Sequence, residues 1–319
     1  MNATYAFHRR TSLRQTGMTL VELLVAMVVG LSVIGAGLAM YVSSGSSSSA
    51  SGQITQMSED ANAALSILRT HVAMTGYSRP ISATATGMTK LYDGQVIFGC
   101  QNGLSANSTS QLMSSGTVLT CDGGDPSANE MLIIAYEADT NNTIPTSANT
   151  GTDCLGNAIP ALTHATAGPY YIAENRFYLS QTGSLLCRGN GNTSTPGAPG
   201  NPQPLVDNIA DFSVMYGVSG NDTINGTTVP GTFAKRYMTA AEVGAMTDAT
   251  WKHVVSVRLC VVVRSEDNAL DAVAAPYQDC HGKTITPTTW GSPAKADKRS
   301  YRLFTSTVVL HNRAQQVME

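Results

Sequence analysis

A single carboxylate lies inside the most apolar stretch of this 319-residue chain. Residues 18–42 read MTLVELLVAMVVGLSVIGAGLAMYV, and Glu22 is their one charged residue. A carboxylate at membrane depth costs roughly 2.5 kcal/mol or more unless it is paired, so such a residue indicates a function. If a peptidase cut the chain after Gly17, a new ammonium group would appear on Met18, about one helical turn from Glu22. In a helical stack of subunits, this carboxylate could neutralise the ammonium group of a neighbour.

The apolar segment around Glu22 is long enough to cross a membrane. As a helix, residues 18–42 would span roughly 37 Å at 1.5 Å per residue, and a bilayer core measures about 30 Å. Arg9, Arg10 and Arg14 precede the segment, so the positive-inside rule predicts a cytoplasmic N-terminus. The remainder of the chain, from Ser43 onward, is then expected outside the cytoplasm.

An ordinary signal peptide is the first alternative to this anchor. Signal peptides have an apolar run of 7 to 15 residues followed by small residues at the cleavage site. Here the run is longer, although Ala36, Gly37 and Ala39 supply small residues for a late cut. The acid at Glu22 and the glycine at the polar–apolar boundary, Gly17, favour cleavage before the run instead.

The six cysteines all follow the apolar segment, and none forms a CxxC pair. An even number in an exported region fits disulfides in an oxidising compartment such as the periplasm, and the absence of CxxC argues against a zinc site. Six cysteines allow 15 pairings. The favoured set joins sequence neighbours because each bond closes a modest loop, and free buried thiols are the alternative. These pairs are Cys100 with Cys121, Cys154 with Cys187, and Cys260 with Cys280.

A second helical pattern follows the serine-rich residues 43–52, which are either a flexible tether or a melted stretch of a longer helix. Apolar residues then recur every three or four positions, which predicts one buried stripe. Gly76 and Pro80 end the pattern. The stripe consists of Ile54, Met57, Ala61, Ala64, Leu65, Leu68 and Val72.

Strand patterns separated by Gly, Asn, Ser and Pro dominate the chain after residue 80. Residues 219–232 are expected to form a polar loop, and residues 239–248 a helix. The predicted fold class is α+β, with one long N-terminal transmembrane and stem helix packed on an antiparallel sheet. The candidate strands are Gln95–Cys100, Met131–Glu137, Tyr170–Ser180, Ser184–Arg188, Ile209–Val218, His253–Arg264 and Tyr301–His311.

Motifs for catalysis, cofactors and metals are not found in the sequence. It has no GxSxG, HExxH or GxGxxG, and HGKT at 281–284 lacks the glycine of a phosphate-binding loop, since Tyr277 stands there. The net charge of −3 gives no reason to expect nucleic acid as a partner. Residues 121–130 and 219–228 are rich in oxygen ligands but do not match a calcium loop. No cofactor and no metal are therefore expected.

The string Gly17-Met18-Thr19-Leu20-Val21-Glu22, preceded by a short basic leader, resembles the class III signal of type IV prepilins and pseudopilins. The resemblance implies cleavage between Gly17 and Met18 by a prepilin peptidase, N-methylation of Met18, and an assembly role for Glu22. More loosely, residues 76–80, 254–268 and 301–313 resemble PilW-type minor pilins. The family often has a proline about twenty mature residues in, where this chain has Ala39 instead.

The resemblance implies a subunit that is no enzyme and that assembles with other major and minor pilins through an inner-membrane assembly machinery. It is expected as a single-pass inner-membrane protein and then in a pilus at the cell surface. The expected parts are a leader (1–17), a transmembrane and assembly helix (18–42), a serine-rich and amphipathic continuation (43–80) and an exported β-rich domain (81–319). A pseudopilin of type II secretion, a pilus-tip adhesin module and an anchored periplasmic enzyme are the alternatives.

Overall fold

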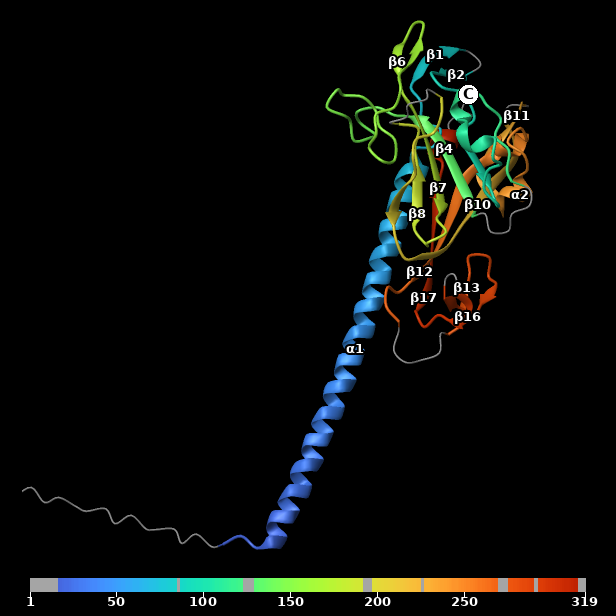
Figure 1. The fold of residues 1–319 in the computed structure, drawn as a ribbon. Helices are drawn as coiled ribbons and strands as arrows, with labels where there is room; N and C mark the ends of the chain where they lie inside the picture. Colours follow the sequence, from blue (N-terminus) through green and yellow to red (C-terminus); the bar gives the residue numbers. More distant parts are fainter. Residues whose placement is uncertain are drawn as a thin grey trace, which may run out of the picture. The chain divides into compact units, whose positions relative to one another are not determined.

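The computed structural model describes residues 17–84, 87–122, 129–191, 197–224, 227–268, 275–289 and 292–314. The chain divides into two compact units, Met1–Ser51 and Gly52–Glu319. One continuous helix, α1 (Leu20–Met74), contributes to both and is drawn in blue in Figure 1. The expected fold class, a long N-terminal helix followed by an antiparallel β domain, is confirmed.

The first unit contains the apolar half of α1. Every described side chain from Gly17 to Gly45 is exposed, including large aliphatic ones such as Leu31 at 69%. An 18-residue window of α1 has a mean hydropathy of 2.4 and none of it is buried. By length and composition this helix can therefore cross a membrane, and its bare apolar surface needs lipid or other helices to cover it.

The serine-rich residues 43–52 are helical, so α1 has no break between its two predicted segments. Once a helix has started, each added residue forms one more backbone hydrogen bond. The helix can therefore continue through a short stretch of weak helix formers when strong helix formers lie on both sides of it. Serine side chains in α1 also bond back to the preceding turn, as Ser58 does to the carbonyl of Ile54 at 2.9 Å. Both alternatives for these residues, a flexible tether and a melted stretch of a longer helix, were therefore wrong.

The amphipathic half of α1 packs in the second unit. Met57, Leu68 and Val72 are at most 1% exposed, which confirms most of the predicted stripe. Ile54, at 44% exposure, lies outside it. The helix ends before Gly76, which adopts a positive φ of 75° and donates its N–H to the carbonyl of Ala135 at 3.0 Å.

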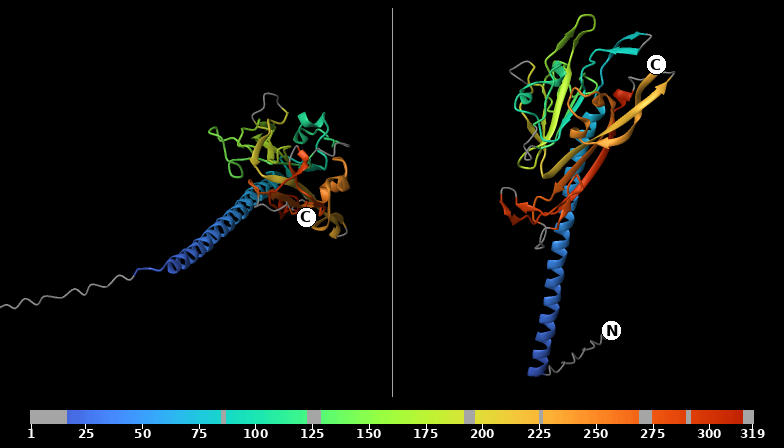
Figure 2. Two further views of the ribbon diagram at one scale, coloured as in Figure 1. Left: turned by 60° about the horizontal axis from the view of Figure 1, so that its bottom comes forward. Right: turned by 90° about the vertical axis from the view of Figure 1, so that its right-hand side faces the viewer.

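Two antiparallel sheets form the body of the second unit, where the sequence predicted one sheet. They occupy different sides of this unit in the right-hand view of Figure 2, and β10 contacts both β4 and β7. The first sheet has the order β3-β4-β7-β8-β9, with β3 Ile97–Cys100, β4 Met131–Glu137, β7 Ile172–Leu179, β8 Leu185–Arg188 and β9 Gln203–Val206. The second has the order β11-β10-β12-β17, with β10 Ile209–Ile224, β11 Thr227–Met238, β12 Val254–Arg264 and β17 Tyr301–Val309.

Short hairpins, helices and 3₁₀ turns complete the described part of this unit. The hairpins are β1–β2 (Pro80–Thr84, Gly87–Lys90), β5–β6 (Leu162–His164, Gly168–Tyr170), β13–β14 (Tyr277–Gln278, Thr284–Ile285) and β15–β16 (Thr288–Thr289, Ser292–Ala296). The helices and turns are η1 Ser108–Ser110, η2 Met113–Ser115, α2 Ala240–Val243, η3 Ala249–His253 and α3 His311–Ala314.

Each predicted strand is present, with shifted ends in most cases, but two other predictions were wrong. Residues 219–232 were expected to be a loop, and their described part instead extends β10 and β11 into a long hairpin. The expected helix 239–248 is reduced to the four residues of α2. A capping box of Thr239 and Glu242 starts α2, and Gly244, with φ of 103°, follows its end.

Aromatic side chains fill the core between the two sheets. The ring of Trp251 is fully buried and lies edge-on to Phe98 and to Tyr216, with centroid distances of 5.2 and 4.9 Å. Such edge-to-face pairs add about 0.5–1.5 kcal/mol beyond their buried area. A Cβ at Gly99 would overlap the Tyr216 ring, so this close packing requires glycine there.

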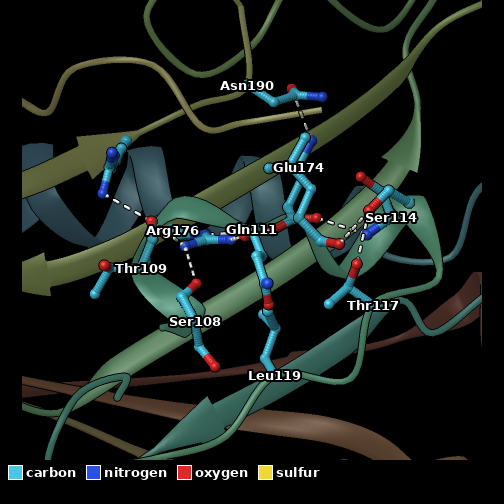
Figure 3. Close-up of polar contacts among 12 residues, drawn as sticks. Ser108, Thr109, Gln111, Ser114, Thr117, Leu119, Glu174, Arg176 and Asn190 are labelled. Atoms are coloured by element: carbon cyan, nitrogen blue, oxygen red, sulfur yellow. Dashed lines mark hydrogen bonds and ion pairs between the residues drawn. The ribbon is translucent and has the colours of Figure 1, made fainter. Parts of the chain in front are cut away.

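Three disulfides hold loops against the sheets, and they join Cys100 to Cys121, Cys154 to Cys187, and Cys260 to Cys280. The loop between Cys100 and Cys121 is also held by a buried ion pair on β7. Arg176 bonds Glu174 at 2.9 Å and donates to backbone carbonyls of Ser108, Thr109 and Gln111. Figure 3 shows these bonds converging on the Arg176 side chain. The second Glu174 oxygen accepts the Ser114 N–H at 2.7 Å.

Candidate processing and assembly site

The peptide bond between Gly17 and Met18 lies in a short non-helical segment ahead of α1. Residues 17–19 have no regular secondary structure, and the helix begins at Leu20. Met18 is 70% exposed, and a Cβ built on Gly17 would meet no atom within 4 Å. The described part of the chain therefore leaves this bond accessible. A requirement for glycine at this position would come from the peptidase and not from packing in this protein.

Thr19 and Glu22 form a capping box that starts α1. The hydroxyl of Thr19 accepts the N–H of Glu22 at 3.3 Å, and Oε2 of Glu22 accepts the N–H of Thr19 at 3.0 Å. The Thr19 hydroxyl also donates to Oε2 at 3.1 Å. These bonds satisfy backbone donors that the first turn of a helix otherwise leaves without partners. Glu22 is therefore held in place by its own helix start.

The same device recurs at α2, where Thr239 and Glu242 make the equivalent three bonds at 2.7, 3.1 and 3.3 Å. The surroundings of the two acids differ. Glu242 starts a four-residue helix of the β domain, whereas Glu22 precedes an apolar helical run that spans roughly 30 Å, about the thickness of a bilayer core. A helix start needs only the cap, so the cap alone does not account for an acid in an otherwise uncharged segment.

The Glu22 carboxylate can accept a further charged donor. Both bonds from Thr19 go to Oε2, and a carboxylate offers about four acceptor sites over its two oxygens. The positive end of the helix dipole at this first turn also favours a negative charge. An ammonium group brought close to Glu22 would therefore find a positioned and ionised partner.

The sequence prediction located Gly17, Met18 and Glu22 but missed Thr19. The pattern Thr-x-x-Glu before an apolar run is itself a capping-box signature, so the signal was present. The basic residues Arg9, Arg10 and Arg14 lie outside the described residues. The two oxygen-rich loops, 121–130 and 219–228, lie partly outside them as well.

Comparisons with known proteins agree with this N-terminal pattern. Residues 12–38 match the prokaryotic N-terminal methylation motif, and residues 169–312 match the type IV pilus-assembly protein W family, PilW. A search of curated proteins gives no match. Among solved structures, a type IV-like pilin from Thermus thermophilus is 12% identical, with a TM-score of 0.34, over 80% of this chain and 97% of that chain. That similarity is too low to transfer structural detail.

An N-terminal methylation motif, an apolar helix with one acid at its start and a disulfide-bonded β domain characterise this chain as a type IV pilin-like protein. Within this class the chain is PilW-like, because its PilW match includes β7 to β12 and β17 of the described domain. The family consists of structural subunits and not of enzymes. The type IV pilin family implies prepilin processing and association with other pilins, and the apolar helix with the prepilin motif suggests a membrane anchor.

Proposed function

We propose that this chain is a minor pilin that takes part in the assembly or initiation of a type IV pilus. A prepilin peptidase cuts between Gly17 and Met18, and the new amino group of Met18 is N-methylated. The mature subunit waits in the inner membrane and then enters the fibre through the apolar half of α1. The chain performs no chemistry of its own and is a substrate of the processing enzyme.

The position of Glu22 carries this proposal. It is the one acid in residues 18–42, and the apolar side chains that follow it are exposed. When these side chains are covered by lipid or by other helices, an unpaired carboxylate costs roughly 2.5 kcal/mol or more. The N-methylated amine of Met18 on a neighbouring subunit supplies the missing positive charge. The pair then fixes the axial position of one helix against the next.

The orientation of the chain across the inner membrane follows from its N-terminal segment. The three arginines of the leader keep the N-terminus in the cytoplasm, where the leader is removed. The domain beyond α1 is then periplasmic, which agrees with its three disulfides. After assembly this domain is displayed on the pilus.

Three variants separate the charge of Glu22 from its capping role. Glu22→Gln keeps a capping box, because glutamine accepts the same backbone N–H, but it removes the charge. Thr19→Ala weakens the cap and leaves the charge. Glu22→Val removes both. The subunit is counted in sheared pili by quantitative immunoblotting, and leader removal is checked by mass in each strain.

We expect all three variants to lose the leader. Both Glu22 variants should be incorporated at one tenth of the wild-type level or less, while Thr19→Ala stays within about twofold, since a lost cap costs roughly 1 kcal/mol of helix stability. Normal incorporation of Glu22→Gln would show that the charge has no assembly role and would remove the basis of the proposal.

A pseudopilin of a type II secretion system would share this N-terminal chemistry, so the fibre must be assigned by phenotype. Deletion of a minor pilin reduces the number of pili and leaves exoprotein secretion unchanged. The opposite result, lost secretion with normal pili, would assign the chain to a secretion pseudopilus.

A further inference from the structure

A cluster of ligand-type side chains lies in the second unit, far along the chain from the processing site. Asp211 on β10 meets Asp279 and His281, which lie in the tight turn between β13 and β14. One ligand atom from each of these three residues lies within 4.8 Å of the other two. The two aspartates are half-buried and His281 is exposed, so the cluster is open to solvent on one side.

Covalent and hydrogen bonds position this cluster. The disulfide Cys260–Cys280 ties the turn to β12, and Cys260 is the register partner of Ser213 on β10. The N–H of Cys280 donates to Oδ2 of Asp211 at 2.8 Å. Oδ1 of Asp279 accepts two backbone N–H groups of its own turn, from His281 at 2.9 Å and Lys283 at 2.8 Å. The side chains are therefore held before any ligand arrives.

A fourth side chain, that of Glu130, contacts His281. Glu130, just before β4, has a side chain only 5% exposed. Its Oε1 accepts the N–H of Val214 at 3.0 Å, while its Oε2 has no hydrogen-bond partner in the described part of the chain. That oxygen lies 3.9 Å from Nε2 of His281, which is also 3.4 Å from the hydroxyl of Ser213. Burying a carboxylate oxygen without a hydrogen-bond partner costs free energy, and a bound cation would lower that cost.

We infer that Glu130, Asp211, Asp279 and His281 form a binding site for one divalent transition-metal cation, with zinc as the best-fitting ion. Three carboxylates face one imidazole, so the cluster has an excess of negative charge even when His281 is protonated. Imidazole and carboxylate together suit zinc, whereas calcium and magnesium take oxygen ligands alone. Four protein ligands are the number that structural zinc sites use.

The cation would join three separate parts of the domain. It links the segment before β4, the strand β10 and the β13–β14 turn, at the place where Cys260–Cys280 already ties the turn to β12. Sequence reasoning missed this site because the four proposed ligands come from three segments that lie far apart in the chain. This inference does not depend on the role of the chain in the pilus.

The full mature chain, purified in detergent and stripped with EDTA, tests the site by titration with zinc chloride in a calorimeter. Wild-type protein should take up one equivalent, and the midpoint of thermal unfolding should rise on loading because the ion binds the folded state. His281→Ala should abolish this uptake. Glu130→Gln should weaken it roughly tenfold or more, because one of the four proposed ligands loses its charge.

The matched control is His311→Ala, which removes an exposed histidine at the start of α3. It should bind zinc as the wild type does. No uptake by wild-type protein would overturn the inference, as would equal uptake by His281→Ala and wild type. Unchanged affinity in Glu130→Gln would also overturn it, since the buried carboxylate would then not be a ligand. Binding of calcium in place of zinc would contradict the assignment of the ion.

Discussion

At the scale of single residues, we propose two roles for Glu22, one in the isolated subunit and one in the fibre. In the isolated subunit its carboxylate closes the capping box with Thr19, and in the fibre it is proposed to meet a neighbouring amine. Gly17, Met18 and Glu22 could be named from the sequence because they lie within six residues and their order is itself the signal. The four proposed metal ligands could not, because only the folded domain brings Glu130 and Asp211 to His281.

His71 predicts a loss of stability in acid. It lies at the end of α1, with Nδ1 3.0 Å from the hydroxyl of Tyr136, and burial lowers its pKa to about 4. The unfolded chain takes up this proton near pH 6.5, before the folded chain does. Stability is therefore full above pH 6.5 and falls as the pH drops towards 4, by up to about 3 kcal/mol.

The measurement compares wild type with His71→Gln, which cannot be protonated in this range and can still bond Tyr136. Unfolding free energies from urea titrations at pH 7 and pH 4.5 give the slope for each protein. Carboxylates titrate in both, so the difference between the two slopes belongs to His71. Equal slopes would mean that the folded protein protonates His71 as readily as the unfolded chain does.

At the scale of elements, the sequence predicted the apolar strands better than the polar ones. β4 was found at its observed ends and β12 within one residue, because both are mostly apolar. The β10–β11 hairpin was missed because its outer half is built from Gly, Asn and Thr, which are ordinary turn residues. In this hairpin the hydrogen bonds between β10 and β11 outweigh the local preference of these residues for turns. Such pairing depends on the tertiary structure.

The buried ion pair of Glu174 and Arg176 on β7 leads to a prediction about the stability of the domain. Arg176 is 1% exposed at its side chain and is the donor to three backbone carbonyls of the loop between Cys100 and Cys121. Arg176→Met leaves these carbonyls and Glu174 without their partner, at a cost of about 3–5 kcal/mol. Thermal unfolding, followed by the fluorescence of the protein, should show a midpoint roughly 10 °C lower.

Two further proteins make this prediction specific. Arg302→Met removes an exposed arginine on β17 and should change stability by no more than about 0.5 kcal/mol. The double variant Arg176→Met with Glu174→Gln should recover part of the loss, since no buried charge remains unpaired. A single Arg176→Met variant as stable as wild type would show that the loop is held by its disulfide alone.

At the scale of the whole molecule, sequence and structure contribute different parts of the account. In the sequence, the charge asymmetry and the apolar run predict the membrane anchor, and the cysteines predict an oxidising compartment for the domain. The division of that domain into two sheets was not predictable from the sequence. The alternation of apolar and polar residues along a strand shows that one face is buried, but it does not show which element covers that face.

The central claim is that the chain becomes functional only when its leader is removed at one bond. Gly17→Leu should block this cut, because the peptidase and not the chain requires glycine there. The uncut protein then keeps its leader and cannot place an amine opposite Glu22.

Mass spectrometry of the N-terminus of the protein from its native host tests this claim most directly. We expect a mature chain that begins at Met18 and carries one methyl group on its amine. A chain that still begins at Met1, or one trimmed after the apolar stretch near Ala39, would contradict the account.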